Sequence, residues 1–276
     1  MEIKDLGSTS LNVIVDCLTE SFKGYFVELP NDVNYWETRY KNARVDYTLS
    51  YGVFDNGKLV AFIINCIDIQ GGKKTAYNTG TGVLPAYRGK ALVDKLYGYA
   101  IPILKKKGVE QLSLEVIQTN ERAIHVYKRL GFEITHDLPC FKGTITLPDK
   151  PGVTVAKIKY KDALPLMATV TAHHAWDFTM QAVKKAHAGW AFYKVEENRN
   201  YLGYFIVNPV GNTIVQMELA KGLDNGHWKT LLCGIKQVIP EMRIINVDAN
   251  RTNLIAALLH AGLNNFIDQF EMEKPI

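Results

Sequence analysis

The sequence contains little that would support a disulfide framework, a metal site or a membrane span. Only four of its 276 residues are cysteines, and none of them forms the closely spaced pairs of zinc sites. The longest apolar runs, such as Leu59–Cys66, are too short to cross a bilayer. The N-terminal residues lack the charged, apolar and cleavage segments of a signal peptide. We therefore expect a cytoplasmic protein with no metal and no membrane partner.

An excess of charge of one sign is also missing. Lysine and arginine number 32 against 28 aspartate and glutamate residues, which leaves a net charge of +4. The one compact basic cluster, Lys105–Lys107, falls at the end of an expected helix, where cations interact favourably with the helix dipole. We expect no nucleic-acid partner. The 47% of hydrophobic residues suffices for one large domain or two ordinary ones.

The first half of the chain alternates helical and strand patterns. Apolar spacing predicts helices over residues 11–22, 36–42, 88–107 and 121–130, and strands over residues 47–54, 59–69, 74–83 and 111–116. Asn56 and Gly57 predict a tight hairpin between two of these strands. Pro102 is expected to kink or shorten the third helix. The pattern is that of a mixed α/β domain.

The second half repeats this order of elements after a turn-forming run at residues 147–152. We expect helices over 162–174, 227–238 and 253–260, and strands over 189–195, 203–208, 213–219 and 243–247. Adding 131 to the residue number carries Leu114, Val116, Gly131 and Phe132 onto Ile245, Val247, Gly262 and Leu263. The simplest interpretation is two copies of one fold, over residues 1–147 and 153–276. Two unrelated α/β units with similar endings are the alternative.

The stretch from Thr79 to Val93 is a strand that turns through proline and small residues into a helix. The first turn of a helix has unpaired N–H groups and a positive dipole end, so it can hold a pyrophosphate without a specific side chain. Arg88 and Lys90 add positive charge at this turn. Many helices begin with glycine and a basic residue without binding anything, so the stretch alone is a weak signal.

A second segment strengthens this hypothesis. Asn120 follows a predicted strand, Tyr127 lies two turns into the next helix, and Leu130-Gly131-Phe132 ends that helix. Together with Arg88 and Ala123, this pattern resembles the GNAT superfamily of acyl-CoA N-acyltransferases. The resemblance covers roughly residues 10–140 in the order of elements, and its specific motifs fall between residues 81 and 132.

The resemblance implies the α/β (α+β) class, with two GNAT-like domains that are each a mixed, mostly antiparallel sheet flanked by helices. It implies acetyl-CoA as the co-substrate of the first domain. It assigns three residues to the pantetheine arm, Thr81, Gly82 and Val83. It assigns six residues to the pyrophosphate, Arg88, Gly89, Lys90, Ala91, Leu92 and Val93. Asn120 would contact the same cofactor. The sequence departs from the family pattern where Ala91 and Val93 replace loop glycines.

The mechanism that the resemblance implies is direct attack of a neutral amine on the thioester. An N–H near Val83 would stabilise the carbonyl oxygen, and Tyr127 would protonate the leaving thiolate. Tyr127 could instead be an aromatic residue of the helix's inner face. The general base stays open among Glu115, Glu20 and solvent.

The acceptor is expected to be a small-molecule or peptide amine. Tyr25 and Phe26 would line its pocket. His173 and His174 are predicted to be a surface pair on one helix and not metal ligands, because adjacent helical positions point apart. A homodimer stays an open alternative.

The second domain is expected to be a non-catalytic copy. Its corresponding turn lacks the Arg-Gly pair, Arg251 stands opposite Asn120, and Leu258 stands opposite Tyr127. Two other hypotheses remain beside the enzyme. One is a GNAT-fold module that binds acyl-CoA or a partner without turnover, and the other is an α/β protein with no CoA site.

Overall fold

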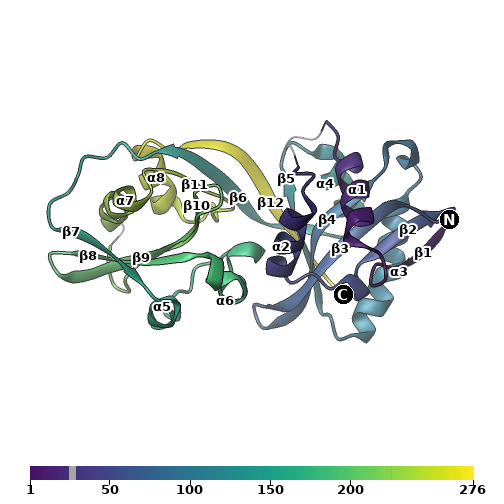
Figure 1. The fold of residues 1–276 in the computed structure, drawn as a ribbon, viewed down its shortest axis with the longest axis horizontal. Coiled ribbons are helices and arrows are strands. Elements are labelled where there is room, and N and C mark those ends of the chain that lie inside the picture. Colours follow the sequence, from purple (N-terminus) through teal and green to yellow (C-terminus); the bar gives the residue numbers. More distant parts are fainter. Residues whose placement is uncertain (25–28, 225) are drawn as a thin grey trace. The chain divides into compact units, whose positions relative to one another are not determined.

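A computed structural model describes residues 1–24, 29–224 and 226–276, and divides the chain into two compact units (Figure 1). The N-terminal unit consists of Met1–Thr135 together with Glu271–Ile276, and the C-terminal unit consists of His136–Phe270. These limits differ from the expected domains 1–147 and 153–276. The division falls within two strands and not in the turn-forming run at residues 147–152, because the last residues of the chain pack with the N-terminal unit.

The N-terminal unit begins with one strand and two helices and continues with a meander of strands. Its elements are β1 (Glu2–Asp5), α1 (Leu11–Ser21), α2 (Val33–Ala43), β2 (Tyr51–Asp55), β3 (Lys58–Gln70), β4 (Lys73–Val83), α3 (Leu92–Lys106), β5 (Gln111–Ile117), α4 (Glu121–Arg129) and the start of β6 (Glu133–Thr144). The predicted helix over residues 11–22 and strand over residues 74–83 are confirmed. The hairpin is also confirmed, since Asn56 and Gly57 both have positive φ values, of 50° and 80°.

Three local predictions for this unit are corrected. Tyr47–Leu49 form a 3-10 turn and not the start of a strand, and the Asp46 side chain accepts the Thr48 N–H at 2.9 Å to cap that turn. The third helix begins at Leu92 and not at residue 88, and it continues through Pro102 to Lys106. A proline in mid-helix removes one backbone hydrogen bond, but packing keeps the helix going.

The sheet of this unit is mostly antiparallel, as expected. β1 pairs with β2, β2 with β3 and β3 with β4, all antiparallel, whereas β4 and β5 are parallel neighbours joined through α3. Residues 60–64 of β3 are completely buried, which marks the centre of the core. Such a continuous apolar run is typical of a strand that is covered on both faces.

The C-terminal unit repeats this order. Its elements are β7 (Val153–Ile158), α5 (Tyr160–Met167), α6 (Met180–Ala186), β8 (Ala191–Glu197), β9 (Asn200–Asn208), β10 (Thr213–Leu219), α7 (His227–Val238), β11 (Glu241–Ile244), α8 (Thr252–His260) and the start of β12 (Asn264–Pro275). β7 to β10 are antiparallel neighbours, and β10 and β11 are parallel. Its two apolar clusters hold alternate β9 side chains, such as Phe205 in one and Tyr204 in the other.

The helix predicted over residues 162–174 is wrong in its second half. α5 ends at Met167, two residues after Pro165, and His173 and His174 lie in an irregular segment. Proline removes a backbone donor and crowds the preceding turn, which disfavours a longer helix here. Elsewhere, no helix in the described ranges has both the length and the apolar character needed to cross a bilayer.

The last residues of the chain complete the N-terminal unit. Ile276 N–H donates to the Glu110 carbonyl at 2.9 Å, and the Lys274 ammonium donates to the Leu130 carbonyl. Thr135 Oγ1 contacts the Glu271 carbonyl at 3.4 Å, and the Met272 side chain is fully buried. The core of this unit therefore depends on residues from the end of the chain, such as Glu271, which lies 136 positions after its contact Thr135.

We expect Met272→Ala to destabilise the N-terminal unit by about 2–5 kcal/mol, because the substitution leaves a cavity in a packed core. Chemical denaturation followed by circular dichroism measures this change. Ile134→Ala is the matched control, since Ile134 lies in the same unit and is 37% exposed. Equal stability of the two variants would contradict the structural role of the terminal segment.

Candidate active site

The central feature of the N-terminal unit is the divergence of its two parallel strands. β4 and β5 pair from Thr75 and Gln111 up to Asn78 and Leu114. β4 then continues to Val83, still paired with β3, while β5 continues to Ile117. The side of β4 that faces β5 therefore presents main-chain N–H and C=O groups beyond Asn78. An extended ligand can pair with such an edge as a further strand would.

The three residues predicted to contact a pantetheine arm lie on this edge. Thr81, Gly82 and Val83 are the last residues of β4. Gly82 is also required by packing, because a Cβ there would come within 2.5 Å of the Phe62 ring and 3.0 Å of Ser21 Cβ. The glycine thus keeps β4 close to the core beneath it.

The predicted pyrophosphate turn follows at once. A 3-10 turn at Pro85–Tyr87 leads into the exposed residues 88–91, and α3 begins at Leu92. Gly89 has φ of 76° and Ala91 has φ of 52°. These positive values interrupt the helix predicted from residue 88, since an α-helix requires negative φ. Ala91 adopts this conformation at a cost of about 1–2 kcal/mol compared with glycine.

The turn leaves room for an anion. A Cβ added to Gly89 would meet no atom within 4 Å, so the space beside this residue is open. The N–H groups of Leu92 and Val93 lie in the first turn of α3, where no intrahelical acceptor exists, and the positive end of the dipole coincides with them. Val93 is half-buried. The geometry fits recognition of phosphate by the main chain.

The two basic side chains of the turn are directed by other contacts. Arg88 Nη2 donates to the Ser21 carbonyl at 3.0 Å, which ties the turn to the C-terminal end of α1. Lys90 Nζ lies 4.7 Å from the centre of the Tyr87 ring, a cation–π contact. Tyr87 in turn donates to Asp55 Oδ2 at 2.8 Å. The Arg88 guanidinium therefore has a structural partner, and Lys90 is exposed at the mouth of the turn.

An acidic residue in the first turn of α3 is neutralised by α4. Arg129 donates to both carboxylate oxygens of Asp94, at 3.0 and 2.7 Å. The hydrogen bond from Arg129 lowers the pKa of Asp94, so the carboxylate stays charged. Without Arg129, this negative charge would oppose an anion at the helix N-terminus. The ion pair also joins the helix that carries the turn to the helix that carries Tyr127.

The predicted cofactor contact Asn120 and the predicted acid Tyr127 both belong to α4. Asn120 Oδ1 accepts the Ala123 N–H at 3.2 Å, so Asn120 is the N-cap of the helix. Tyr127 is 9% exposed, and its ring lies 5.8 Å from that of Phe132 in an edge-on arrangement. Asn120 fixes where α4 begins, and this in turn sets the position of Tyr127.

Two polar residues at the point of divergence, Asn78 and Tyr97, were not predicted from the sequence. Asn78 donates to Thr81 Oγ1 at 2.8 Å and to the Tyr97 hydroxyl at 2.7 Å. Asn78 is 7% exposed and Tyr97 is 2% exposed. Burial raises the pKa of Tyr97 well above its usual range, and the nearby phenol of Tyr127 adds to this shift. The available signal was a carboxamide inside an otherwise buried strand, which requires hydrogen-bond partners.

Residues on the acceptor side are only partly described. Tyr25 and Phe26, predicted to line the acceptor pocket, lie outside the described residues. Arg39 of α2 reaches Thr79 Oγ1 at 3.5 Å. Of the two carboxylates considered as a base, Glu20 forms an ion pair with Lys23, and Glu115 is a half-buried residue of β5. Neither is assigned as the base.

The C-terminal unit has a corresponding pair of parallel strands, but β11 ends at Ile244, where its pairing with β10 ends, so the two strands do not both continue as β4 and β5 do. Parallel pairing of β10 and β11 ends at Ile214 and Ile244, and β10 continues to Leu219. Arg251 is the N-cap residue of α8, as Asn120 is of α4, and it donates to Glu218 Oε2 at 2.8 Å. This ion pair stands at the edge of a cleft lined by both strands. Leu258, which the shift of 131 residues places opposite Tyr127, is fully buried.

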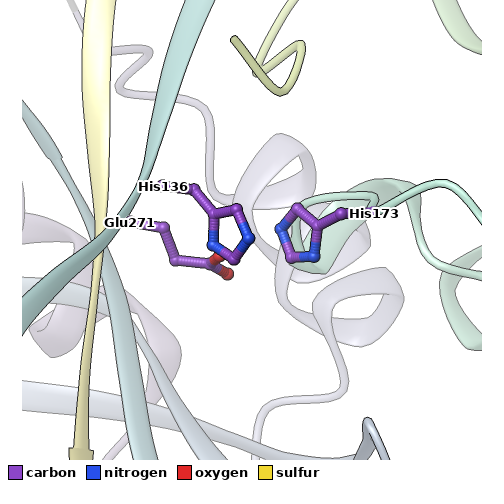
Figure 2. Close-up of side chains that lie close together, drawn as sticks. All are labelled: His136, His173 and Glu271. Carbon is purple, nitrogen blue, oxygen red and sulfur yellow. The ribbon is translucent and has the colours of Figure 1, made fainter. Parts of the chain in front are cut away.

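The histidine pair of this unit is not the predicted surface pair. His174 Nε2 lies 3.2 Å from Glu218 Oε1, and both side chains are at most 14% exposed. His173 stacks on His136, with parallel rings whose centres are 3.9 Å apart (Figure 2). Glu271, labelled in the same figure, is a fully buried residue of the N-terminal unit. The irregular segment after α5 allows both histidines to turn inward.

The N-terminal unit is similar in sequence to known acetyltransferases. Residues 14–132 match the model of the acetyltransferase (GNAT) family. The ribosomal protein bS18-alanine N-acetyltransferase of Escherichia coli strain K12 is 36% identical over 84 residues, which are 30% of this chain and 54% of the relative. The chain therefore spans about half the length of this curated relative.

Two solved structures have a similar fold over the whole chain. A GCN5-related N-acetyltransferase from Sphaerobacter thermophilus has a TM-score of 0.71 at 11% identity and covers 99% of this chain and 95% of its own. A tandem GNAT protein from the clavulanic acid biosynthesis pathway has a TM-score of 0.68 at 12% identity and covers 99% and 98%. At these identities the similarity concerns the fold alone.

We expect Arg129→Gln to weaken binding of CoA about two- to fivefold, because it leaves Asp94 uncompensated at the N-terminus of α3. The double variant Asp94→Asn/Arg129→Gln is expected to return to within about twofold of the wild type, since the opposing charge is then gone as well. Calorimetric titration at two salt concentrations measures both. A double variant that binds as weakly as Arg129→Gln would show that charge is not the cause.

Proposed function

We propose that this chain transfers an acetyl group from acetyl-CoA to a primary amine, because residues 14–132 match the model of the acetyltransferase (GNAT) family. The main support for the proposal is that the open edge of β4 and the start of α3 lie in the same unit and both offer main-chain donors. Thr81–Val83 and Leu92–Val93 bring main-chain donors to one end of the same unit. An extended amide chain that ends in a pyrophosphate matches this arrangement.

In the proposed complex the main chain does most of the binding. Thr81, Gly82 and Val83 pair with the pantetheine arm, and the N–H groups of residues 89–93 surround the pyrophosphate, since the Arg88 N–H donates to the Pro85 carbonyl at 3.3 Å. Lys90 contributes charge, because its ammonium group is exposed at the turn. Arg88 acts indirectly, by holding the turn against α1 through Ser21. Asn120 acts through the start of α4, with its side-chain oxygen engaged by Ala123.

The proposed reaction is direct transfer. The amine nitrogen forms a bond to the thioester carbonyl carbon, and the carbon–sulfur bond breaks. Negative charge that develops on the carbonyl oxygen is stabilised by the N–H of Val83 at the diverging edge. The thiolate takes a proton from Tyr127, and the acceptor nitrogen releases a proton to a base that is not yet assigned. Tyr127 suits the role because the ordinary pKa of a phenol lies just above that of a thiol.

The acceptor is proposed only as a primary amine of a small molecule or peptide. The bacterial relative acts on an alanine of ribosomal protein bS18, as its name states, but the chain covers only 54% of that relative. We propose that α1 and α2 border the acceptor side of the site, and neither helix carries a motif that identifies the amine. We propose further that the C-terminal unit is non-catalytic, because Arg251 and Leu258 replace Asn120 and Tyr127.

A second candidate function is binding of acyl-CoA without turnover. Two observations favour it. Ala91 has a positive φ, a backbone conformation that glycine adopts more easily. Neither carboxylate considered as a base is assigned to that role, since Glu115 is a residue of β5 and Glu20 forms an ion pair with Lys23. Binding and turnover must therefore be measured separately.

Gly89→Val is expected to weaken binding of acetyl-CoA about tenfold, because valine at φ of 76° distorts the turn. Gly108→Val is the matched control, since Gly108 has φ of 77°, lies at the other end of α3 and also has open space beside it. Calorimetric titration of both variants and the wild type measures the effect. Absence of binding to the wild type would remove the proposed function altogether.

Tyr127→Phe is expected to lower kcat about 100-fold or more and to leave the Kd of acetyl-CoA nearly unchanged, because only the transferred proton is lost. Release of free thiol, with an amine panel as acceptor, measures turnover. Tyr99→Phe is the control, since Tyr99 is 42% exposed on α3. Equal kcat in Tyr127→Phe and the wild type across the pH range would exclude the proposed acid, and binding without turnover in the wild type would favour the second candidate.

A further inference from the structure

A single carboxamide occupies the point where β4 and β5 separate. Asn78 is the last residue of β4 that pairs with β5, and it is 7% exposed. Its Nδ2 donates to Thr81 Oγ1 at 2.8 Å and to the Tyr97 hydroxyl at 2.7 Å. Its Oδ1 accepts the Gly80 N–H at 2.9 Å. Both donor hydrogens of the amide are therefore used, and the side chain has one defined orientation.

These contacts shape the edge of β4. Between Asn78 and Gly80 the pairing with β3 shifts, and Thr79 is the extra residue of this bulge. The hydrogen bonds from Asn78 to Gly80 and Thr81 close the strand around the bulge. A bulge redirects the residues that follow it. Asn78 thus sets the direction in which Thr81–Val83 continue after the strands part.

The Asn78 side chain also contacts the aromatic wall beside Tyr127, the proposed acid. This wall consists of Tyr97 and Phe132. Tyr97 is 2% exposed, and its ring packs edge-on against Phe132 at 5.5 Å. Phe132 also packs against Tyr127, with ring centres 5.8 Å apart. The Tyr97 phenol keeps its proton, because burial and the neighbouring Tyr127 phenol raise its pKa. A neutral hydroxyl that accepts from Asn78 is compatible with this apolar wall.

We propose that Asn78 is a positioning residue for acyl transfer, which holds the β4 edge and, through Tyr97 and Phe132, the wall beside Tyr127 in one fixed arrangement. This inference rests on the proposed function. The geometry connects the two halves of the site, the edge that receives the thioester and the helix that delivers the proton, through one buried side chain. A shift of either half by a fraction of an ångström lowers the rate more than it lowers binding.

The test compares Asn78→Asp, Tyr97→Phe and the double variant. Asn78→Asp keeps the acceptor for Gly80 but removes both Nδ2 donors, and Tyr97→Phe removes only the hydroxyl. Thr75→Val is the matched control, because Thr75 is a fully buried polar residue at the other end of the β4–β5 pairing. For each variant, kcat, the KM for acetyl-CoA, the Kd of CoA and the melting temperature are measured, with kinetics taken well below melting.

We expect Tyr97→Phe to lower kcat about tenfold with less than about a threefold change in KM, and Asn78→Asp to lower kcat further and raise KM. The double variant should lose less than the product of the two single losses, since both act through one contact. Thr75→Val should lower the melting temperature without changing kcat.

Different outcomes separate the two proposals. Suppose that the wild type is active. The positioning role is then overturned if folded Tyr97→Phe has the kcat of the wild type. It is also overturned if the loss of kcat in the double variant equals the product of the two single losses. A wild type that neither binds CoA nor releases thiol would overturn the proposed function itself. If Asn78→Asp does not fold, the isosteric Tyr97→Phe still decides the question.

Discussion

The parallel pairing of β4 and β5 ends at Asn78 and Leu114 while both strands continue, and the candidate site depends on this divergence. A sheet normally uses every inner N–H and C=O group in its own ladder. Separation of two central strands exposes such groups without creating an outer edge that could pair with another chain. The site is thus a local interruption of the sheet, supported on the other side of β4 by pairing with β3 on both sides of the bulge at Thr79.

Several conspicuous side chains at the site support the main chain instead of facing a ligand. Arg88 binds the end of α1, Asn120 caps α4, and Arg129 neutralises Asp94 at the start of α3. The proposed recognition by backbone groups is compatible with an alanine at position 91. What the turn requires is a positive φ and open space, and alanine provides the first at a modest cost in free energy.

The C-terminal unit repeats the order of elements of the N-terminal unit with different side chains at the corresponding place. β10 and β11 are parallel neighbours as β4 and β5 are, although β11 ends at Ile244 with the pairing, and α8 starts at the corresponding place. Arg251 then pairs with Glu218, and His174 lies against the same carboxylate. A buried charge needs such partners to be tolerated. The same fold can therefore carry an open strand edge in one unit and an ion pair in the other.

The sequence by itself determined the alternation of helices and strands from α1 to α4 and the correspondence of Arg251 with Asn120, but it did not predict β1, β6, β7, α6 or β12. Apolar periodicity and the choice of turn residues report local backbone geometry, and these features are local. Only the tertiary structure decided that α3 starts at Leu92, that Glu271–Ile276 belong to the N-terminal unit and that Asn78 meets Tyr97. Contacts between residues far apart in the chain arise from packing, and no pattern along the sequence encodes their distances.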